Sequence, residues 1–176
     1  MITDDLTLAA PTIEHKQEAM QFRREFLESA GRIDGGQGLH NFEIYEDWLG
    51  YTEKVRNGEF TDFVKSTVYF AVNNKNNRIV GMVDIRHSLN DALLIRGGHI
   101  GYGVRPSERK KGYASKMLAL ALDECRRLGI AKALLTCDKD NIASARVIQK
   151  NGGVLENEFT DDAGEITQRY WIDVVI

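Results

Sequence analysis

The sequence contains little cysteine and proline and no long hydrophobic run. Only two cysteines, Cys125 and Cys137, and two prolines occur in 176 residues. The cysteines have no Cys-x-x-Cys or histidine-rich spacing, which argues against a disulfide framework and predicts two reduced thiols in a cytoplasmic protein. No apolar run approaches the roughly 18 residues of a membrane helix, so no membrane association is expected. The N-terminal residues are acidic where a secretion signal needs positive charge.

An excess of charge of one sign is also absent. The chain carries 23 Lys and Arg against 26 Asp and Glu, a formal net charge of -3. It therefore lacks the basic surplus of a nucleic-acid-binding protein, and no nucleic-acid partner is expected. The four histidines are scattered, so no metal site is predicted. With 43% hydrophobic residues in this length, we expect one globular domain over residues 1–176.

Hydrophobic periodicity predicts both helices and strands. The expected helices cover 13–30, 42–56, 112–128 and 141–150. The expected strands cover 6–9, 66–72, 78–87, 97–104, 132–137, 154–159 and 167–176. The three strands between 66 and 104 are expected to form an antiparallel meander, while the helix at 112–128 predicts a parallel crossover. We therefore expect an α/β fold of the α+β type, with a mixed, largely antiparallel central sheet flanked by helices.

The segment GHIGYGVRPSERKKGYASKMLALAL, which begins at Gly98, has the features of an anion site. A predicted strand ends at Val104, and Gly112 opens a helix whose first N–H groups have no partners within that helix. These groups lie at the positive end of the helix dipole and suit a phosphate. Four basic residues gather between them: Arg105, Arg109, Lys110 and Lys111. The glycine patterns of nucleotide triphosphatases and dinucleotide-binding folds are both missing.

The spacing Arg109-x-x-Gly112-x-Ala114 resembles the Gln/Arg-x-x-Gly-x-Gly/Ala motif of the GNAT superfamily of acetyl-CoA-dependent N-acetyltransferases. Three further segments are similar to family features: Val104-Arg105-Pro106 to the splayed strand, Asn141 with Ser144 to the start of the next helix, and Lys150-Asn151-Gly152-Gly153 to the segment after it. The resemblance implies the GNAT fold and places the cofactor-binding core at about residues 66–176.

The resemblance also implies a reaction and a set of cofactor contacts. Acetyl-CoA would be the co-substrate, without a metal, and the acetyl group would pass directly to a small-molecule or peptide amine in a ternary complex. Homodimers occur among similar proteins. The implied cofactor-binding residues are Tyr102, Gly103, Val104, Arg109, Lys110, Lys111, Gly112, Tyr113, Ala114, Asn141 and Ser144.

The catalytic residues are less clearly indicated. Many family members carry a tyrosine seven residues after the helix-opening asparagine, and this position is Ile148 here. Tyr102, Tyr113 and Tyr170 are candidate substitutes, each with packing as the alternative role, and Tyr102 is the catalytic candidate. His99 is the candidate base because imidazole titrates near neutral pH, ahead of His87 and Asp84. The missing tyrosine keeps open an alternative function, a non-catalytic acyl-CoA-binding module.

Two loops are candidates for the acceptor side. Residues 156–165 hold five acids and no base, which indicates either a solvated hairpin or a surface that attracts a cationic amine. Residues 31–38 contain four glycines and predict a flexible loop. The family resemblance implies that these loops shape the acceptor pocket.

Overall fold

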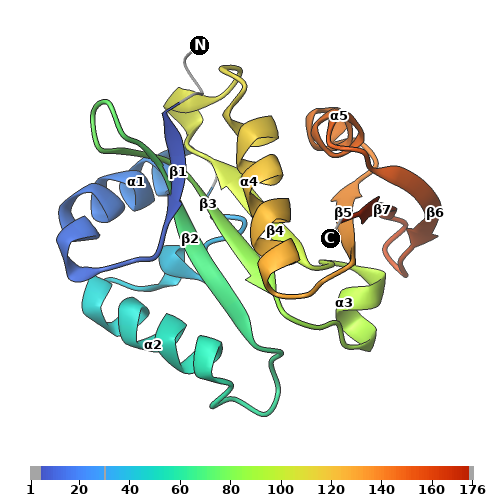
Figure 1. Ribbon diagram of the computed structural model, residues 1–176, viewed down its shortest axis with the longest axis horizontal. Helices are drawn as coiled ribbons and strands as arrows, with labels where there is room; N and C mark the ends of the chain where they lie inside the picture. Colours follow the sequence, from blue (N-terminus) through green and yellow to red (C-terminus); the bar gives the residue numbers. More distant parts are fainter. Residues whose placement is uncertain (1–4, 30, 175–176) are drawn as a thin grey trace.

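Two antiparallel sheets lie side by side (Figure 1), in a computed structural model that describes residues 5–29 and 31–174. The four-stranded sheet has the order β1-β2-β3-β4, and the three-stranded sheet has the order β5-β7-β6. The strands are β1 (Leu6–Ala9), β2 (Ser66–Asn73), β3 (Arg78–Arg86), β4 (Ile100–Val104), β5 (Lys132–Asp138), β6 (Val154–Thr160) and β7 (Ile166–Asp173).

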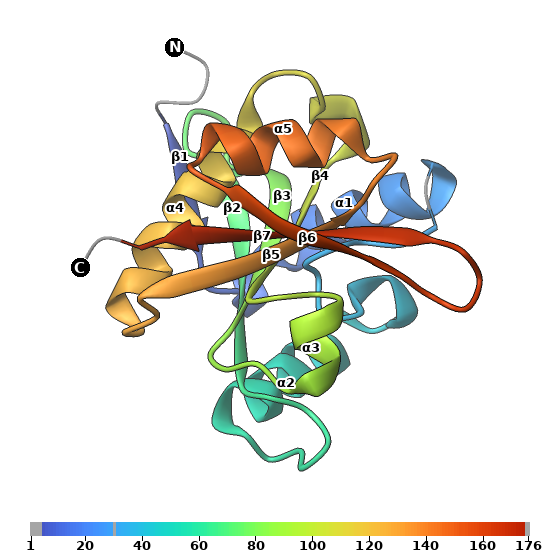
Figure 2. The same cartoon turned by 90° about the vertical axis from the view of Figure 1, so that its right-hand side faces the viewer.

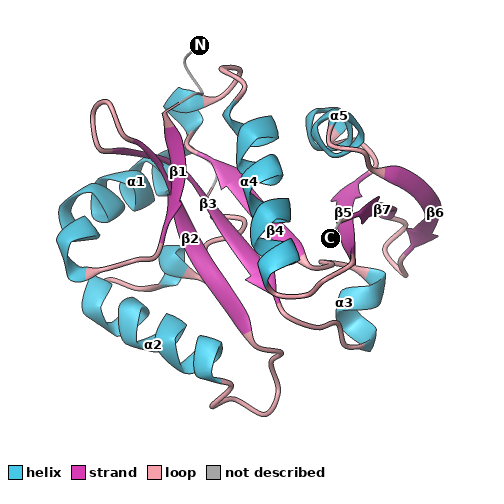
Figure 3. Ribbon diagram, in the orientation of Figure 1, coloured by secondary structure: helices cyan, strands magenta, loops and turns pink. Residues whose placement is uncertain are grey.

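Helices cover both sheets (Figure 3). Helices α1 (Lys16–Ser29) and α2 (Tyr45–Asn57) pack on one face of the four-stranded sheet, and α4 (Tyr113–Arg127) packs on the opposite face. Figure 2 shows α5 (Ile142–Lys150) and the short α3 (Asp91–Ile95) on opposite sides of the three-stranded sheet. Three single 3-10 turns complete the fold: η1 (Ile13–His15), η2 (Leu39–Asn41) and η3 (Pro106–Glu108).

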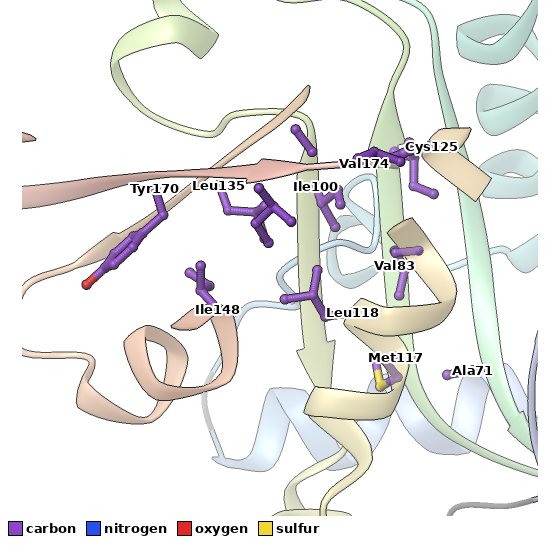
Figure 4. Close-up of a cluster of buried hydrophobic side chains, with 14 of the residues drawn as sticks. Ala71, Val83, Ile100, Met117, Leu118, Cys125, Leu135, Ile148, Tyr170 and Val174 are labelled. Atoms are coloured by element: carbon purple, nitrogen blue, oxygen red, sulfur yellow. The ribbon is translucent and has the colours of Figure 1, made fainter. Parts of the chain in front are cut away.

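Alternation along β3 produces two hydrophobic cores, because neighbouring side chains of a strand point to opposite faces. Met82 is buried in the core formed with α1 and α2, whereas Val83 is buried in the core formed with α4. Figure 4 shows this second core continuing from Val83 and Leu118 to Leu135 and Ile148 of the three-stranded sheet and α5. The α4-side core therefore spans both sheets.

The structure confirms the predicted antiparallel meander and departs from the prediction at several elements. The helix expected at 13–30 begins with η1, and α1 ends at Ser29; its last predicted residue, and the last two of the strand predicted at 167–176, lie outside the described residues. Helix α3 has five residues and was not predicted, because so short a segment shows no hydrophobic period.

The expected parallel pairing is not formed, so the sheet is not mixed. Helix α4 connects β4 to β5, but these strands meet only through one antiparallel bridge, between Gly98 and Leu135. The His99 N–H donates to the Leu134 carbonyl at this point, over 2.7 Å. Among the described residues every paired strand is antiparallel. Beyond the bridge β4 and β5 diverge, and this divergence creates the candidate site.

Candidate active site

A polar cleft of about 200 Å³ lies between the diverging strands β4 and β5. Its walls come from β4, the end of β5, the first turn of α5 and the glycine-rich loop, through residues that include Gly101, Tyr102, Cys137, Asn141, Ser144 and Gly35. Residues far apart in sequence thus meet where the two sheets separate. Sequence analysis identified Tyr102, Asn141 and Ser144 but not Cys137.

The backbone of β4 has one free edge in this cleft. One edge of the strand pairs with β3, in a register that places Val83 opposite Tyr102 and Gly81 opposite Val104. In the described part of the chain the other edge has no strand partner beyond the Gly98–Leu135 bridge. Peptide groups of β4 are therefore available to an extended ligand that binds as an additional strand.

The loop after β4 has a backbone conformation that suits an anion. Lys110 has φ +63° and Gly112 has φ +85°, and a left-handed conformation is unusual for a residue with a side chain such as lysine. Gly112 begins α4 without a side-chain cap. Left-handed residues that precede an uncapped helix turn successive N–H groups toward one point, where an anion is stabilised.

The four basic residues near this loop do not contribute equally. Arg105 is only 3% exposed, and its guanidinium pairs with Glu18 and Glu25, each at 2.6 Å. Lys111 pairs with Glu108 at 2.8 Å. Arg105 is therefore buried and is not part of the basic cluster predicted beside the loop. The charge of Lys111 is partly neutralised by Glu108.

Arg109 and Lys110 remain at this loop. The Arg109 guanidinium lies 5.9 Å from the centre of the Phe26 ring, and its Nε donates to the Val104 carbonyl over 3.3 Å. These contacts hold Arg109 between α1 and the end of β4. An arginine fixed in this way can bind an oxyanion with little further loss of conformational freedom.

Tyr102 and Ser144 form a hydroxyl pair across the cleft. Their oxygen atoms are 2.9 Å apart. The side chain of Asn141 caps α5 by accepting the Ser144 N–H over 3.1 Å, which confirms the predicted start of this helix. Burial raises the pKa of Tyr102 to about 12, so its phenol is protonated at neutral pH and can donate a hydrogen bond.

The other positions considered for the group that protonates the leaving thiolate lie away from the cleft. Ile148 is fully buried in the core between α5 and the three-stranded sheet (Figure 4). Tyr113 is buried, and its hydroxyl accepts a hydrogen bond from Asn73 over 3.1 Å. Tyr170 is buried and donates to Gln168 over 2.7 Å. Of the three candidate tyrosines, Tyr102 is the one whose side chain lines the cleft.

His99 is held in a structural hydrogen bond. Its Nδ1 accepts the backbone N–H of Leu134 over 3.0 Å, so the neutral ring carries its proton on Nε2. Burial and the nearby Arg86 lower its pKa. Protonation would turn Nδ1 into a second donor facing the Leu134 N–H. His87, the other histidine considered, contacts Thr67 Oγ1 at 2.9 Å.

Most of the acidic hairpin is already paired with basic residues. Arg169 pairs with Glu156 and Lys139 pairs with Glu158, at 2.7 and 2.8 Å. Arg96 lies within 4 Å of carboxylates of Asp161 and Glu165, at 3.7 and 3.6 Å. Because these three basic residues compensate part of the acidic charge, the field that could attract a cation is weaker than the sequence suggested.

Two ion pairs at the cleft were not identified from the sequence. Arg96 pairs with Asp138 at 2.8 Å, and Arg32 pairs with Asp34 at 2.6 Å. All four residues line the cleft. Arg96 follows α3 and Asp138 ends β5, 42 residues later, so no local pattern could have revealed their contact. Cys137 lies beside Asp138, and burial raises its thiol pKa to about 11.

Two negative findings apply to the described residues. In that part of the chain, no helix is long and apolar enough to cross a bilayer. The same residues bring no group of three His, Cys, Asp or Glu side chains into an arrangement that could hold a metal ion.

Comparison with known proteins identifies the class. The profile of the acetyltransferase (GNAT) domain matches residues 6–154, so the chain belongs to the GNAT acetyltransferase family, as the motif at Arg109–Ala114 indicated. It is an acetyltransferase of this family. No curated protein sequence matches the chain.

Several solved structures share the fold. An acetyltransferase from Salmonella typhimurium that modifies an N-terminal serine of a 50S ribosomal subunit protein is 16% identical, with a TM-score of 0.70 and coverage of 98% of this chain and 97% of that one. A spermidine N-acetyltransferase chimera from Vibrio cholerae and hSSAT is 14% identical, with a TM-score of 0.67 and 97% coverage of both chains. The microcin C7 self-immunity acetyltransferase, in complex with acetyl-CoA and AMP, is 17% identical, with a TM-score of 0.68 and coverage of 97% and 93%.

Proposed function

We propose that this protein is an N-acetyltransferase that transfers the acetyl group of acetyl-CoA directly to a small-molecule or peptide amine in a ternary complex. The observation that carries the proposal is the free edge of β4 leading into the left-handed loop before α4. An unpaired strand edge suits the amide groups of a pantetheine arm, and the N–H groups of this loop suit a diphosphate. Residues 66–176 would form the cofactor side, and the first 65 residues would shape the acceptor side.

The cofactor contacts follow from this arrangement. Tyr102 and Val104 would offer backbone groups on the free edge of β4 to the pantetheine arm, and Gly103, whose backbone pairs with β3, would lie between them. The backbone N–H groups from Arg109 to Ala114, those of Lys110, Lys111, Gly112 and Tyr113 among them, would hold the diphosphate. Tyr113 would contribute only its backbone, because its side chain is buried in the core. Asn141 would keep Ser144 at the cleft by capping α5.

The chemistry of the cleft is positioning and hydrogen bonding. Acetyl-CoA, when bound, supplies an acetyl group activated as a thioester. The acceptor nitrogen forms the new C–N bond, the C–S bond breaks, and the sulfur takes up a proton while the nitrogen loses one. The Tyr102–Ser144 pair can donate a hydrogen bond to the departing sulfur. His99 as the base stays a prediction, opposed by its hydrogen bond to Leu134.

Two measurements test the proposal. Thiol release from acetyl-CoA across a panel of amines separates catalysis from the alternative, a non-catalytic acyl-CoA-binding module, which would bind the cofactor and release no thiol. We also predict a homodimer, and light scattering would measure the mass of the protein in solution.

The diphosphate site itself is tested by Gly112→Asp. This change adds bulk and negative charge where the diphosphate would bind and strains a residue at φ +85°, so the KM for acetyl-CoA should rise at least about a hundredfold. Gly50→Ala is the control, because a Cβ at Gly50 meets nothing within 4 Å. An unchanged KM in a folded Gly112→Asp protein would contradict the assignment.

A further inference from the structure

A second cavity adjoins the cleft and is not used by the chemistry described above. Its volume is about 390 Å³, and it lies between α2, the connection from α2 to β2, and α3. Arg86 lines both this cavity and the cleft between β4 and β5. The two spaces therefore share Arg86 as a wall, and a ligand that spans both must pass beside this side chain.

The floor of this cavity is polar and buried. Asp84 is 5% exposed and Ser66 is 4% exposed. The Gln37 amide donates to both, over 2.8 Å to Asp84 Oδ1 and 2.7 Å to Ser66 Oγ. Its other atom, Oε1, is buried and accepts no hydrogen bond from any described group. A buried acceptor without a donor costs free energy. Because Oε1 is buried, a ligand N–H could reach it only after a shift of the Gln37 side chain.

Arg86 compensates the Asp84 carboxylate only in part. Its Nε lies 3.3 Å from Asp84 Oδ2, while its NH1 donates to the carbonyls of Gly97 and Gly98 over 3.0 and 3.1 Å. Asp62 also lines the cavity, so two carboxylates face one guanidinium. Burial raises the pKa of Asp84, and the charge of Arg86 offsets this effect only in part. An approaching ammonium group would stabilise the charged form of this carboxyl group.

The walls suit the apolar part of such a ligand. Tyr51, Val55, Phe63 and Leu93 line the space above the polar floor. Phe63 is 59% exposed, and its ring is one of a row in which Phe60 contacts both Tyr51 and Phe63, with ring centres 5.4 and 6.1 Å apart. Aromatic faces attract ammonium groups as well as methylene chains.

We propose that this cavity binds an alkylammonium group of the acceptor, held by the Asp84 carboxylate, while a second amine of the same molecule reaches the cleft between β4 and β5. The inference rests on the proposed acetyl transfer and specifies its acceptor class as a diamine. Asp84 is then a specificity-determining residue that contacts the amine that does not react.

The test compares α,ω-diamines of increasing length with monoamines of the same length, using the full-length protein. The wild type should show a lower KM for diamines than for matched monoamines. Asp84→Asn should raise the diamine KM about tenfold or more, as expected for loss of one charged hydrogen bond, and should raise the monoamine KM much less. The KM for acetyl-CoA should change little. Asp47→Asn removes an exposed carboxylate from the first turn of α2 and serves as the matched control.

A second variant and a second measurement keep the test decisive if Asp84→Asn does not fold or if no amine is acetylated. Ala92→Phe places a large ring at an exposed position of the cavity wall, so it should raise the diamine KM without disturbing the buried floor if Asp84→Asn does not fold. Calorimetric titration of the protein with diamine alone measures binding without transfer. Diamine binding that Asp84→Asn abolishes supports the cavity assignment even if no amine is acetylated, an outcome that overturns only the proposed function.

Robust acetylation with equal KM values for diamines and monoamines, and no effect of Asp84→Asn or Ala92→Phe, would overturn the cavity assignment and leave the proposed function intact.

Discussion

At the scale of single residues, the Tyr102–Ser144 hydroxyl pair is the candidate proton donor that lines the cleft, whereas Ile148 is not. Ile148 cannot donate a proton, and its side chain belongs to the core. Tyr102 reaches the same cleft from β4 instead, with its oxygen 2.9 Å from Ser144 Oγ. Because Tyr102 lies on β4 and Ser144 on α5, 42 residues later, their pairing does not follow from any local sequence motif. The sequence indicated both residues as site candidates but did not predict their contact.

Tyr102→Phe removes one hydroxyl and keeps the ring. We expect kcat to fall about 10- to 100-fold, as for loss of a general acid or a hydrogen bond to the leaving sulfur, with little change in the KM for acetyl-CoA. Stopped-flow thiol release measures both parameters. Tyr170→Phe is the matched control, because that hydroxyl contacts Gln168 away from the cleft. Equal kcat values for wild type and Tyr102→Phe would exclude Tyr102 as a proton donor.

At the scale of elements, the glycine-rich loop packs directly on β4. Gly35 has φ +70°, and a Cβ there would overlap the backbone of Gly101 and Tyr102. A Cβ on Gly103 would lie 2.6 Å from the Asp34 carbonyl oxygen. Glycines on both sides thus permit a close approach of loop and strand, which forms one wall of the cleft. The loop was predicted to be flexible from its composition, and its fixed contact with β4 is non-local.

Gly103→Ala should push this loop away from β4. The added methyl group is expected to cost about 1–3 kcal/mol of unfolding free energy by overpacking and to raise the KM for the acceptor amine. Gly50→Ala on α2 is a matched control that should be neutral or slightly stabilising, since helix-interior glycine is unfavourable. Urea denaturation and steady-state kinetics measure the two effects. A Gly103→Ala protein as stable as the wild type would show that the loop moves freely.

Local patterns predicted most elements because each depends on its own hydrophobic period. Helix α4 extends over Tyr113–Arg127, within one residue of the predicted 112–128, because its apolar positions recur over many turns. The prediction that β4 and β5 form a parallel pair was wrong for a different reason. A helix between two strands favours a parallel pair, but β4 and β5 diverge after Gly98, and the position of a divergence depends on both sheets together.

At the scale of the whole molecule, a buried ion-pair network joins α1 to the loop after β4. Arg105, immediately after β4, pairs with Glu18 and Glu25 of α1 at 2.6 Å each. Glu25 also accepts the backbone N–H of Ser107 over 2.6 Å. Helix α1 therefore holds the turn that leads to Lys110 and Gly112. The first third of the chain contributes to the cofactor side as well as to the acceptor side.

This network predicts a pH dependence of stability. Burial alone would raise the pKa of Glu25, but hydrogen bonds from Arg105 and Ser107 outweigh it and lower the pKa from 4.5 to about 2. A carboxyl group whose pKa is lower in the folded state stabilises the protein above its unfolded pKa, so this contribution is complete above about pH 4.5 and is lost as the pH falls toward 2.

Glu25→Gln should therefore be less stable than the wild type by about 2 kcal/mol at neutral pH, the expected cost of one charged hydrogen bond. The difference should shrink as the pH falls toward 2, where Glu25 of the wild type becomes protonated. Thermal unfolding over this pH range measures it. Glu28→Gln, on an exposed position of the same helix, should unfold like the wild type throughout. If the stability difference between Glu25→Gln and wild type is the same at every pH, the charge of Glu25 does not couple α1 to the loop after β4.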